Sequence, residues 1–175
     1  MRVLARGVLP TLLAVGIALA TSVSAAAQTT GTETFSGTIV ASGVSGTRVV
    51  VASSVVAKGV FNGGGRVVEI ENLPGDPDNI SRDDLVFPGG TLHLVTTTLD
   101  FSASVDPQSC ILSARLEQTQ TIAGGTGRFA DATGSFSGTL TGRGLVRRDP
   151  DGGCSQEQAF VFEVASFTLS GTLSF

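Results

Sequence analysis

SGTI at residues 36–39 recurs as SGTL at residues 137–140 and 170–173. Each unit lies inside a run that is predicted to be a β-strand. A glycine in the middle of a strand permits sharp bending of the sheet or the close approach of a second backbone, so the repeat indicates a curved sheet. Because the first unit opens the β-rich part of the chain and the third ends it, pairing of these two strands would close the sheet without exposed edges.

Strand patterns dominate the chain from residue 32 onward, where no helical periodicity is found. The predicted strands cover residues 33–43, 47–61, 65–71, 91–105, 110–122, 135–148 and 158–175, the last being long enough to bend into two. The stretch 72–90 contains three prolines and four aspartates and is predicted to be a surface loop. These patterns predict an all-β fold with a curved antiparallel sheet, for residues 28–175 as one domain. The single antiparallel, eight-stranded closed β-barrel that we expect follows from the family resemblance described below.

The amino-terminal residues predict export. Two arginines precede an apolar run at residues 8–20, and the small residues that follow include Ala25 and Ala27. This order is typical of a secretory signal peptide, and the A-x-A spacing predicts cleavage before Gln28. The apolar run is too short to span a bilayer comfortably. We therefore expect residues 1–27 to be removed and the mature protein to be secreted or otherwise extracytoplasmic, with no membrane span. A retained amino-terminal anchor is the alternative.

The net charge limits the classes of binding partner that we expect, and the cysteine content indicates whether the chain carries a disulfide. The formal net charge is −4, from 11 basic and 15 acidic residues, which argues against nucleic acid and anionic membrane surfaces as partners. Cys110 and Cys154 are the only cysteines. An even number of cysteines in an exported chain most simply pairs, so we predict one disulfide. A catalytic thiol would need activation by His93, the only histidine, and nothing in the sequence places these residues together.

A glycine-rich segment, IAGGTGRFADATG at residues 122–134, connects two predicted strands. It resembles the Gly-Gly-Thr-Gly-x-Phe/Tyr and Ala-x-Gly segment of the allene oxide cyclase and dirigent superfamily. Residues 85–92, LVFPGGTL, are similar to a segment of exported bacterial proteins of that barrel type. The matching motif residues are Gly124, Gly125, Thr126, Gly127, Arg128, Phe129 and Gly134. The resemblance implies a small eight-stranded, calycin-like barrel with an apolar lumen.

The resemblance implies shape-guided chemistry but supplies no catalytic residue. Members with known activity cyclise an unstable epoxide or orient radicals while they couple. This chain has no Tyr and no Trp, so no catalytic residue is carried over. The motif is predicted to be structural: Gly124, Gly125 and Gly127 allow positive φ in a tight connection, and Phe129 would close one end of the barrel. It lacks the Lys-Ser/Thr pair and the helix of a phosphate-binding loop, and we expect no cofactor.

Two titratable residues are candidates for the lumen. Glu163 lies in phase with apolar residues of the last predicted strand, including Phe167, whereas the alternative phase of Phe162 would place Glu163 in solvent. His93 shares a phase with Phe101 that would line the interior, but a solvent-facing or structural histidine is the favoured alternative. A carboxylate buried among apolar walls would have a raised pKa and could serve as a general acid or base.

Further candidates are amides, aromatic rings and a group of aspartates. The ligand-binding candidates are Gln118, Gln120, Phe101 and Phe167. The two glutamines share one face of the strand at residues 110–122 and could form hydrogen bonds with a ligand. Carboxylates are also clustered in the predicted loop, at Asp76, Asp78, Asp83 and Asp84. Ca²⁺ prefers such oxygens, but the EF-hand pattern is not met, so a solvated acidic loop is favoured over a metal site.

Three classes of function fit this barrel. We expect it to bind a small apolar molecule in its lumen without catalysis. A structural or oligomerising cell-envelope protein, in which the barrel forms homo-oligomers, is one alternative, and a cyclase-like or dirigent-like catalyst that acts by shape is the other. Ligand binding needs a cavity of roughly 300 Å³ or more, mostly apolar and with few polar groups, whereas a packed interior would favour the structural role.

Overall fold

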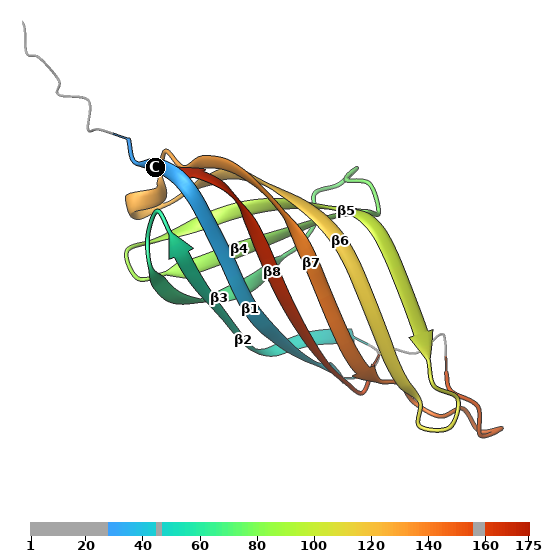
Figure 1. The fold of residues 1–175 in the computed structure, drawn as a ribbon. Helices are drawn as coiled ribbons and strands as arrows, with labels where there is room; N and C mark the ends of the chain where they lie inside the picture. Colours follow the sequence, from blue (N-terminus) through green and yellow to red (C-terminus); the bar gives the residue numbers. More distant parts are fainter. Residues whose placement is uncertain (1–27, 45–46, 156–159) are drawn as a thin grey trace, which may run out of the picture.

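In the computed structural model, which describes residues 28–44, 47–155 and 160–175, the chain forms eight antiparallel strands that close into a barrel (Figure 1). The strands are β1 (Thr30–Val44), β2 (Thr47–Gly59), β3 (Gly63–Ile70), β4 (Ile80–Phe87), β5 (Gly90–Val105), β6 (Ile111–Gly125), β7 (Thr133–Leu145) and β8 (Phe162–Ser174), with a 3-10 turn, η1 (Gly127–Phe129), between β6 and β7. Each strand pairs with the next, and β8 pairs with β1. The predicted all-β, eight-stranded closed barrel is confirmed. The predicted signal peptide, residues 1–27, lies outside the described residues.

The strand that the sequence did not predict is β4, which lies in the stretch predicted to be a loop. Residues 72–90 were expected to be irregular, and residues 158–175 were expected to bend into two strands. Both predictions were wrong. Instead β8 is one strand, and β4 pairs with β3 and β5. Polar residues occupy both faces of β4, so its sequence shows no clear alternation of apolar and polar residues. Asp83 shares the interior face, while Arg82 and Asp84 lie on the opposite face. Cross-strand partners therefore stabilise a segment whose own β-propensity is low.

The repeated glycines are required by the close approach of neighbouring groups. A Cβ atom at Gly138 on β7 would overlap the carbonyl oxygen of Thr168 on β8. A Cβ atom at Gly37 on β1 would overlap the carbonyl oxygen of Ser54 and the ring of Phe167. The first and third repeat units lie on β1 and β8, which pair along nearly their whole length. The predicted pairing of the terminal strands is confirmed, and it leaves the sheet without a free edge.

One end of the barrel is filled with phenylalanine. Neighbouring rings in this cluster have centroids 5.0 to 6.3 Å apart, and the members are Phe35, Phe61, Phe87, Phe129, Phe136 and Phe175. Phe129, on η1, is fully buried at this end, where the carboxyl terminus also lies (Figure 1). The Arg128 guanidinium lies 4.7 Å from the ring centroid of Phe61 and 4.6 Å from that of Phe129. The prediction that Phe129 closes a barrel end is confirmed.

The glycine-rich motif forms the connection that carries η1. Gly124 and Gly127 have positive φ, as predicted. Gly125 does not, so that prediction was wrong; there a Cβ would collide with the carbonyl oxygens of Thr91 and Phe129. The two segments that carry the family resemblance lie side by side, because backbone hydrogen bonds join the β4–β5 turn and the start of β5 to η1 and the residue before it.

At the opposite end, which we call the open end, β5, β6 and β7 extend beyond β3 and β4 (Figure 1). An extra residue at Leu99 shifts the register of β5 against β6, so that Phe101 pairs with Leu116. A disulfide between Cys110 and Cys154, with Cα atoms 5.3 Å apart, ties the β7–β8 connection to the β5–β6 turn. The predicted disulfide is confirmed.

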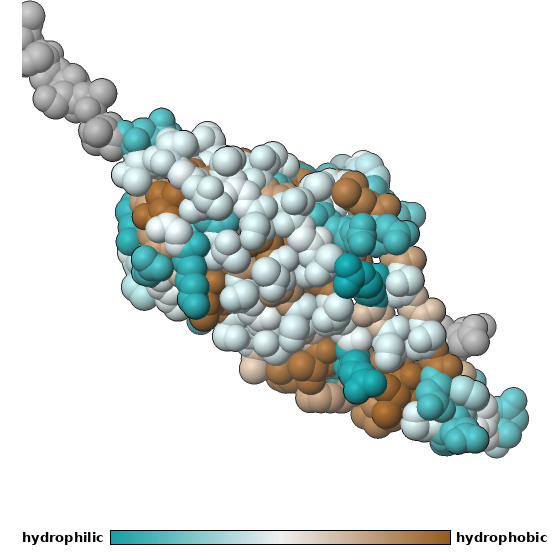
Figure 2. All heavy atoms as spheres, in the orientation of Figure 1, coloured by the Kyte–Doolittle hydropathy of each residue, from teal (hydrophilic) through white to brown (hydrophobic). Residues whose placement is uncertain are grey.

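Apolar side chains are exposed near the open end. Hydrophobic residues gather at the lower end of the face shown in Figure 2, whereas most of the barrel wall above them has intermediate hydropathy. Register places four exposed apolar residues in one row across β2, β8, β7 and β6, namely Val49, Phe162, Leu145 and Ile111. This row lies on the outer face, and homo-oligomer formation through it stays a prediction.

The repeated glycines provide a test of the packing argument. We expect Gly138→Ala to lower the free energy of unfolding by about 1–3 kcal/mol, because the new Cβ must displace backbone of β8. Gly64→Ala is the matched control, since a Cβ there meets nothing within 4 Å. This variant should be as stable as wild type or slightly more stable, because alanine lowers the conformational entropy of the unfolded chain. Urea unfolding followed by circular dichroism measures both. Equal stability of the two variants would contradict the argument.

The disulfide is expected to contribute substantially to stability. The two cysteines are 44 residues apart, and closing a loop of that span stabilises by about 4 kcal/mol through the entropy of the unfolded chain. The double variant Cys110→Ala/Cys154→Ala should therefore unfold at a lower urea concentration than the oxidised protein. Reduced wild-type protein should match the variant, and dithiothreitol should leave the variant unchanged. An unaltered urea midpoint would contradict the prediction that the disulfide stabilises the fold by restricting the unfolded chain.

Candidate functional site

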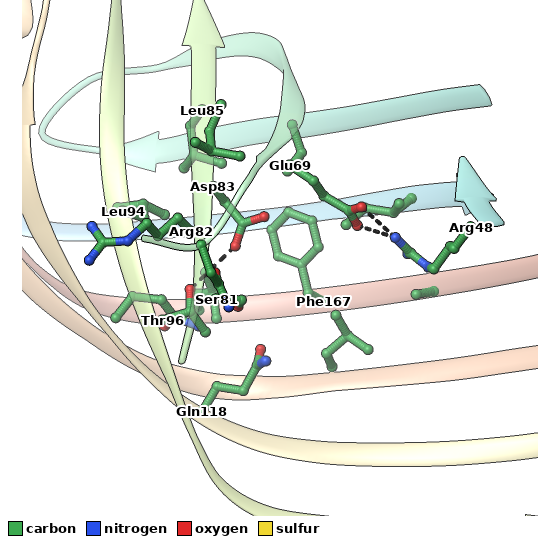
Figure 3. Close-up of a pocket in the computed structure, with 18 of the residues that line it drawn as sticks. Arg48, Glu69, Ser81, Arg82, Asp83, Leu85, Leu94, Thr96, Gln118 and Phe167 are labelled. Carbon is green, nitrogen blue, oxygen red and sulfur yellow. Dashed lines mark hydrogen bonds and ion pairs between the residues drawn. The ribbon is translucent and has the colours of Figure 1, made fainter. Parts of the chain in front are cut away.

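The interior is hollow toward the open end. A cavity of about 460 Å³ lies inside the strands there, larger than the roughly 300 Å³ expected of a ligand site (Figure 3). Its apolar lining includes Leu85, Leu94, Leu140 and Phe167. Ten of the nineteen lining residues are nevertheless polar or charged, so the prediction of only a few polar groups was wrong.

Charged residues reach the cavity because several strands carry one in the inward phase near the open end. Glu69 on β3 pairs directly with Asp83 on β4, and paired residues share one face of a sheet. On β2 one extra residue, Val51, shifts the register against β1, and Arg48 lines the cavity. Glu163, near the start of β8, completes the set. The result is an ionic rim around the hollow half of the barrel.

Arg48 joins two of these carboxylates. Its Nε donates a hydrogen bond of 2.9 Å to Glu163, and its Nη1 donates to both oxygens of Glu69 (Figure 3 shows the Glu69 pair). The inward phase of Glu163, which the sequence left open against a solvent-facing phase, is thereby established. The Arg48 guanidinium is already engaged by protein carboxylates, and Glu163 is held as an ion-pair partner in the rim.

Asp83 differs from the other rim carboxylates, because none of the described residues forms an ion pair with it. Its side chain accepts a long hydrogen bond of 3.4 Å from the Thr96 hydroxyl (Figure 3). Burial, followed by the charge of Glu69, raises the pKa of Asp83 to about 6. This carboxyl group therefore changes its charge close to neutral pH and is able to accept or release a proton inside the cavity.

Two buried amides face the cavity from β6. Gln118 is 9% exposed and Gln120 is 4% exposed, and both line the cavity, as does Phe167. Figure 3 shows the Gln118 amide directed into the space below Phe167. The Gln120 Oε1 atom is buried without a hydrogen-bond partner in the described part of the chain. An unsatisfied buried acceptor costs about 1–3 kcal/mol, so a ligand that donates a hydrogen bond here would recover that free energy.

His93 and Phe101 do not line the cavity, contrary to their selection as lumen residues. His93 is on the outer face, with a side chain 42% exposed and its Nδ1 atom 2.6 Å from Oδ1 of Asp84, which agrees with the solvent-facing alternative. Phe101 is 61% exposed. The bulge at Leu99 moves it into the inward phase, but the pairing of β4 with β5 ends at Thr97, so no strand covers the ring.

The aspartates proposed as a weak metal alternative do not converge. Arg82 forms hydrogen bonds of 2.8 and 3.0 Å to Asp76, and together with the Leu73 amide it holds the pKa of Asp76 below its usual range. Asp83 and Asp84 occupy opposite faces of β4. Asp78 is exposed. Over residues 28–44, 47–155 and 160–175, no three His, Cys, Asp or Glu side chains are arranged to hold a metal ion.

Sequence reasoning missed the ionic rim. Arg48 and Glu69 lie in segments correctly predicted as strands, and alternation with Val67 was a signal for an inward Glu69. The equivalent signal failed for Arg48, because the extra residue at Val51 breaks the two-residue period. Asp83 was assigned to a loop, and only the pairing of β4 with β3 places it beside Glu69.

The comparisons with known proteins identify no relative. No protein-family model matches the chain, and neither curated proteins nor solved structures give a significant match. The resemblance to the allene oxide cyclase and dirigent superfamily therefore stays a prediction. In the described residues, no helix is long and apolar enough to cross a membrane.

The raised pKa of Asp83 predicts a pH dependence of stability. A folded-state pKa of about 6, against an ordinary value of 3.8, means that the folded protein binds more protons than the unfolded chain between these values. Stability contributed by Asp83 is thus highest below pH 4 and falls as pH rises through 6. Asp83→Asn should remove this decline, so that its unfolding free energy exceeds that of wild type more at pH 7 than at pH 4.

Asp76 provides a control of opposite sign. Its pKa is lowered by Arg82, so its contribution is present at neutral pH and is lost as pH falls. Asp76→Asn should therefore destabilise the protein most at pH 7. Urea unfolding between pH 4 and pH 7.5 distinguishes the two variants, and parallel curves for Asp83→Asn and wild type would contradict the assignment.

Proposed function

We propose that the mature chain is an exported small-molecule carrier or receptor that holds its ligand in the open half of the barrel. The observation that carries this proposal is the cavity of about 460 Å³ with buried amides facing it. The oxygen of one of them, Gln120, has no hydrogen-bond partner among the described residues. A cavity kept only for structural reasons would be smaller or lined by satisfied groups. The mixed lining supports a ligand with an apolar body and a polar end, rather than a wholly apolar one.

Export is supported by the disulfide and by the leader sequence. Disulfides persist in oxidising compartments, and the Cys110–Cys154 bond fits that environment. The arginines, apolar run and A-x-A spacing of residues 1–27 are typical of a cleaved signal. Amino-terminal sequencing of protein from the culture medium or periplasm should therefore begin at or near Gln28, and a protein that retains Met1 would contradict export by this signal.

Ligand binding can be tested with the neutral apolar fluorophore N-phenyl-1-naphthylamine. We expect its fluorescence to rise on binding to the wild-type barrel. Ala165→Leu should weaken binding by roughly tenfold, because Ala165 lines the cavity and the larger side chain fills it. Ser166→Leu is the matched control, because Ser166 is next to Ala165 but is exposed on the outer face of the barrel. This variant adds the same leucine outside the cavity and should bind the fluorophore as wild type does.

The outcomes separate the candidate functions. Leu140→Phe is a second variant that fills the cavity. It replaces Ala165→Leu in the test if Ala165→Leu lowers the thermal unfolding midpoint. Equal binding by wild type and both filling variants would place the probe outside the cavity and contradict the proposal. No binding, together with self-association in sedimentation experiments, would favour the structural or oligomerising alternative.

A shape-guided catalyst is the second candidate, favoured by one observation. Asp83 has a pKa of about 6 and faces the cavity, which suits a general acid or base. Native mass spectrometry of the secreted protein would reveal a co-purifying compound. Turnover of that compound by wild type but not by Asp83→Asn would support catalysis, whereas its recovery unchanged from both proteins would support binding alone.

A further inference from the structure

The cationic groups that line the cavity are already paired. Arg48 binds Glu69 and Glu163, and Arg82 is held by two hydrogen bonds from its guanidinium to Asp76. These two arginines are the basic residues in the cavity lining of the described chain, and Arg82 borders the cavity from the outward phase of β4. A ligand anion that entered the cavity would therefore meet only guanidinium groups whose charge is already balanced by protein carboxylates.

The oxygen acceptors that line the cavity are less well satisfied than its cations. Asp83 has a long hydrogen bond to the Thr96 hydroxyl and no ion pair among the described residues. Gln120 Oε1 is buried and unsatisfied in the same part of the chain. Gln118, nine-tenths buried, directs its amide into the same space (Figure 3). The polar side of the cavity is thus complementary to a group that donates several hydrogen bonds and carries positive charge.

The rest of the lining is suited to an apolar body. Phe167, Leu85, Leu94 and Leu140 line the same cavity as Asp83 and Gln118. The phenylalanine cluster fills the barrel beyond them, which limits the length of the ligand.

We infer that the ligand is an amphiphilic organic cation, whose ammonium group pairs with Asp83 and donates a hydrogen bond to Gln120, and whose apolar part lies against Phe167 and its neighbours. This inference rests on the proposed function and specifies its ligand class. A carboxylate ligand would face Asp83 and Glu69 without a free cation. An alcohol could satisfy Gln120 but would leave the charge of Asp83 unpaired.

Binding of a cation to Asp83 must be coupled to pH. The charged groups that face Asp83 in the cavity are Glu69 on β3 and Arg48 on β2, with Glu163 on β8 bound to Arg48. Asp84, next to it on β4, acts only through its charge, because its side chain lies on the outer face. Thr96 is the hydrogen-bonding residue on β5. Because an ammonium group favours the ionised carboxylate, the affinity for an amine falls as pH drops through the pKa of Asp83, which is about 6 in the empty barrel.

Three ten-carbon probes with different head groups test the inference: decylamine, 1-decanol and decanoate, each displacing N-phenyl-1-naphthylamine from the full mature chain at pH 7.5. Decylamine should bind about tenfold more tightly than 1-decanol, with decanoate the weakest. Asp83→Asn should bring decylamine to within about threefold of 1-decanol. Asp84→Asn is the matched control, because the adjacent carboxylate lies on the outer face and should leave the preference intact.

A pH series on wild-type protein gives a readout that needs no variant. Decylamine stays protonated throughout, so its affinity should fall by roughly tenfold between pH 7.5 and pH 5 as Asp83 gains a proton, whereas 1-decanol should change little. Carbon-13 NMR of Asp83 should show a lower pKa when decylamine is bound.

The results distinguish this inference from the proposed function. Equal affinities, or tightest binding of decanoate, would overturn the cation inference while leaving lumen binding in place. Failure of every probe, including the fluorophore, would overturn both. A decylamine preference that survives in Asp83→Asn would also overturn the inference, because it would assign the selectivity to another group.

Discussion

Closure of eight strands is the constraint on which the rest of this structure depends. An eight-stranded barrel has an interior just wide enough to be filled by side chains or to hold one small ligand. The size of the inward side chains at each level therefore decides between a packed core and a cavity. Closure depends on the pairing of β1 with β8, and Gly37 and Gly138 let neighbouring strands and the Phe167 ring approach closely enough to achieve it.

The same closed sheet contains two different interiors. At the end closed by η1, interlocking phenylalanine rings supply the packing and Arg128 covers two of them. Toward the open end polar and charged residues share the inward positions with apolar ones, and a hollow remains. The packed core and the candidate ligand cavity thus lie at opposite ends of the barrel. Two groups in the hollow cost free energy: the Gln120 Oε1 atom, which has no hydrogen-bond partner among the described residues, and the partly buried Asp83, which forms no ion pair with any of them. Proteins retain such costs where a functional site needs them.

Much of the fold was predictable because local signals and tertiary structure agree. Seven of the strands lie where alternation and turn residues predicted them, and the repeated glycines predicted closure. β4 was not predictable, because its polar residues carry no clear period until β3 and β5 pair with it. The candidate site was predictable in part. Glu163, Gln118, Gln120 and Phe167 line the cavity as their strand phases suggested, whereas His93 and Phe101 do not.

The sequence by itself determined the all-β class, the closed barrel, the disulfide and the position of Phe129 at a barrel end. These follow from periodicity, from glycines at fixed positions and from the cysteine count, all of which are local or compositional signals. Only the tertiary structure decided which face of each strand points inward at the open end, because single extra residues at Val51 and Leu99 reverse the alternation. It also placed Asp83 beside Glu69, a residue of another strand. Burial and the charge of Glu69 raise the pKa of Asp83, and both depend on how the strands pair.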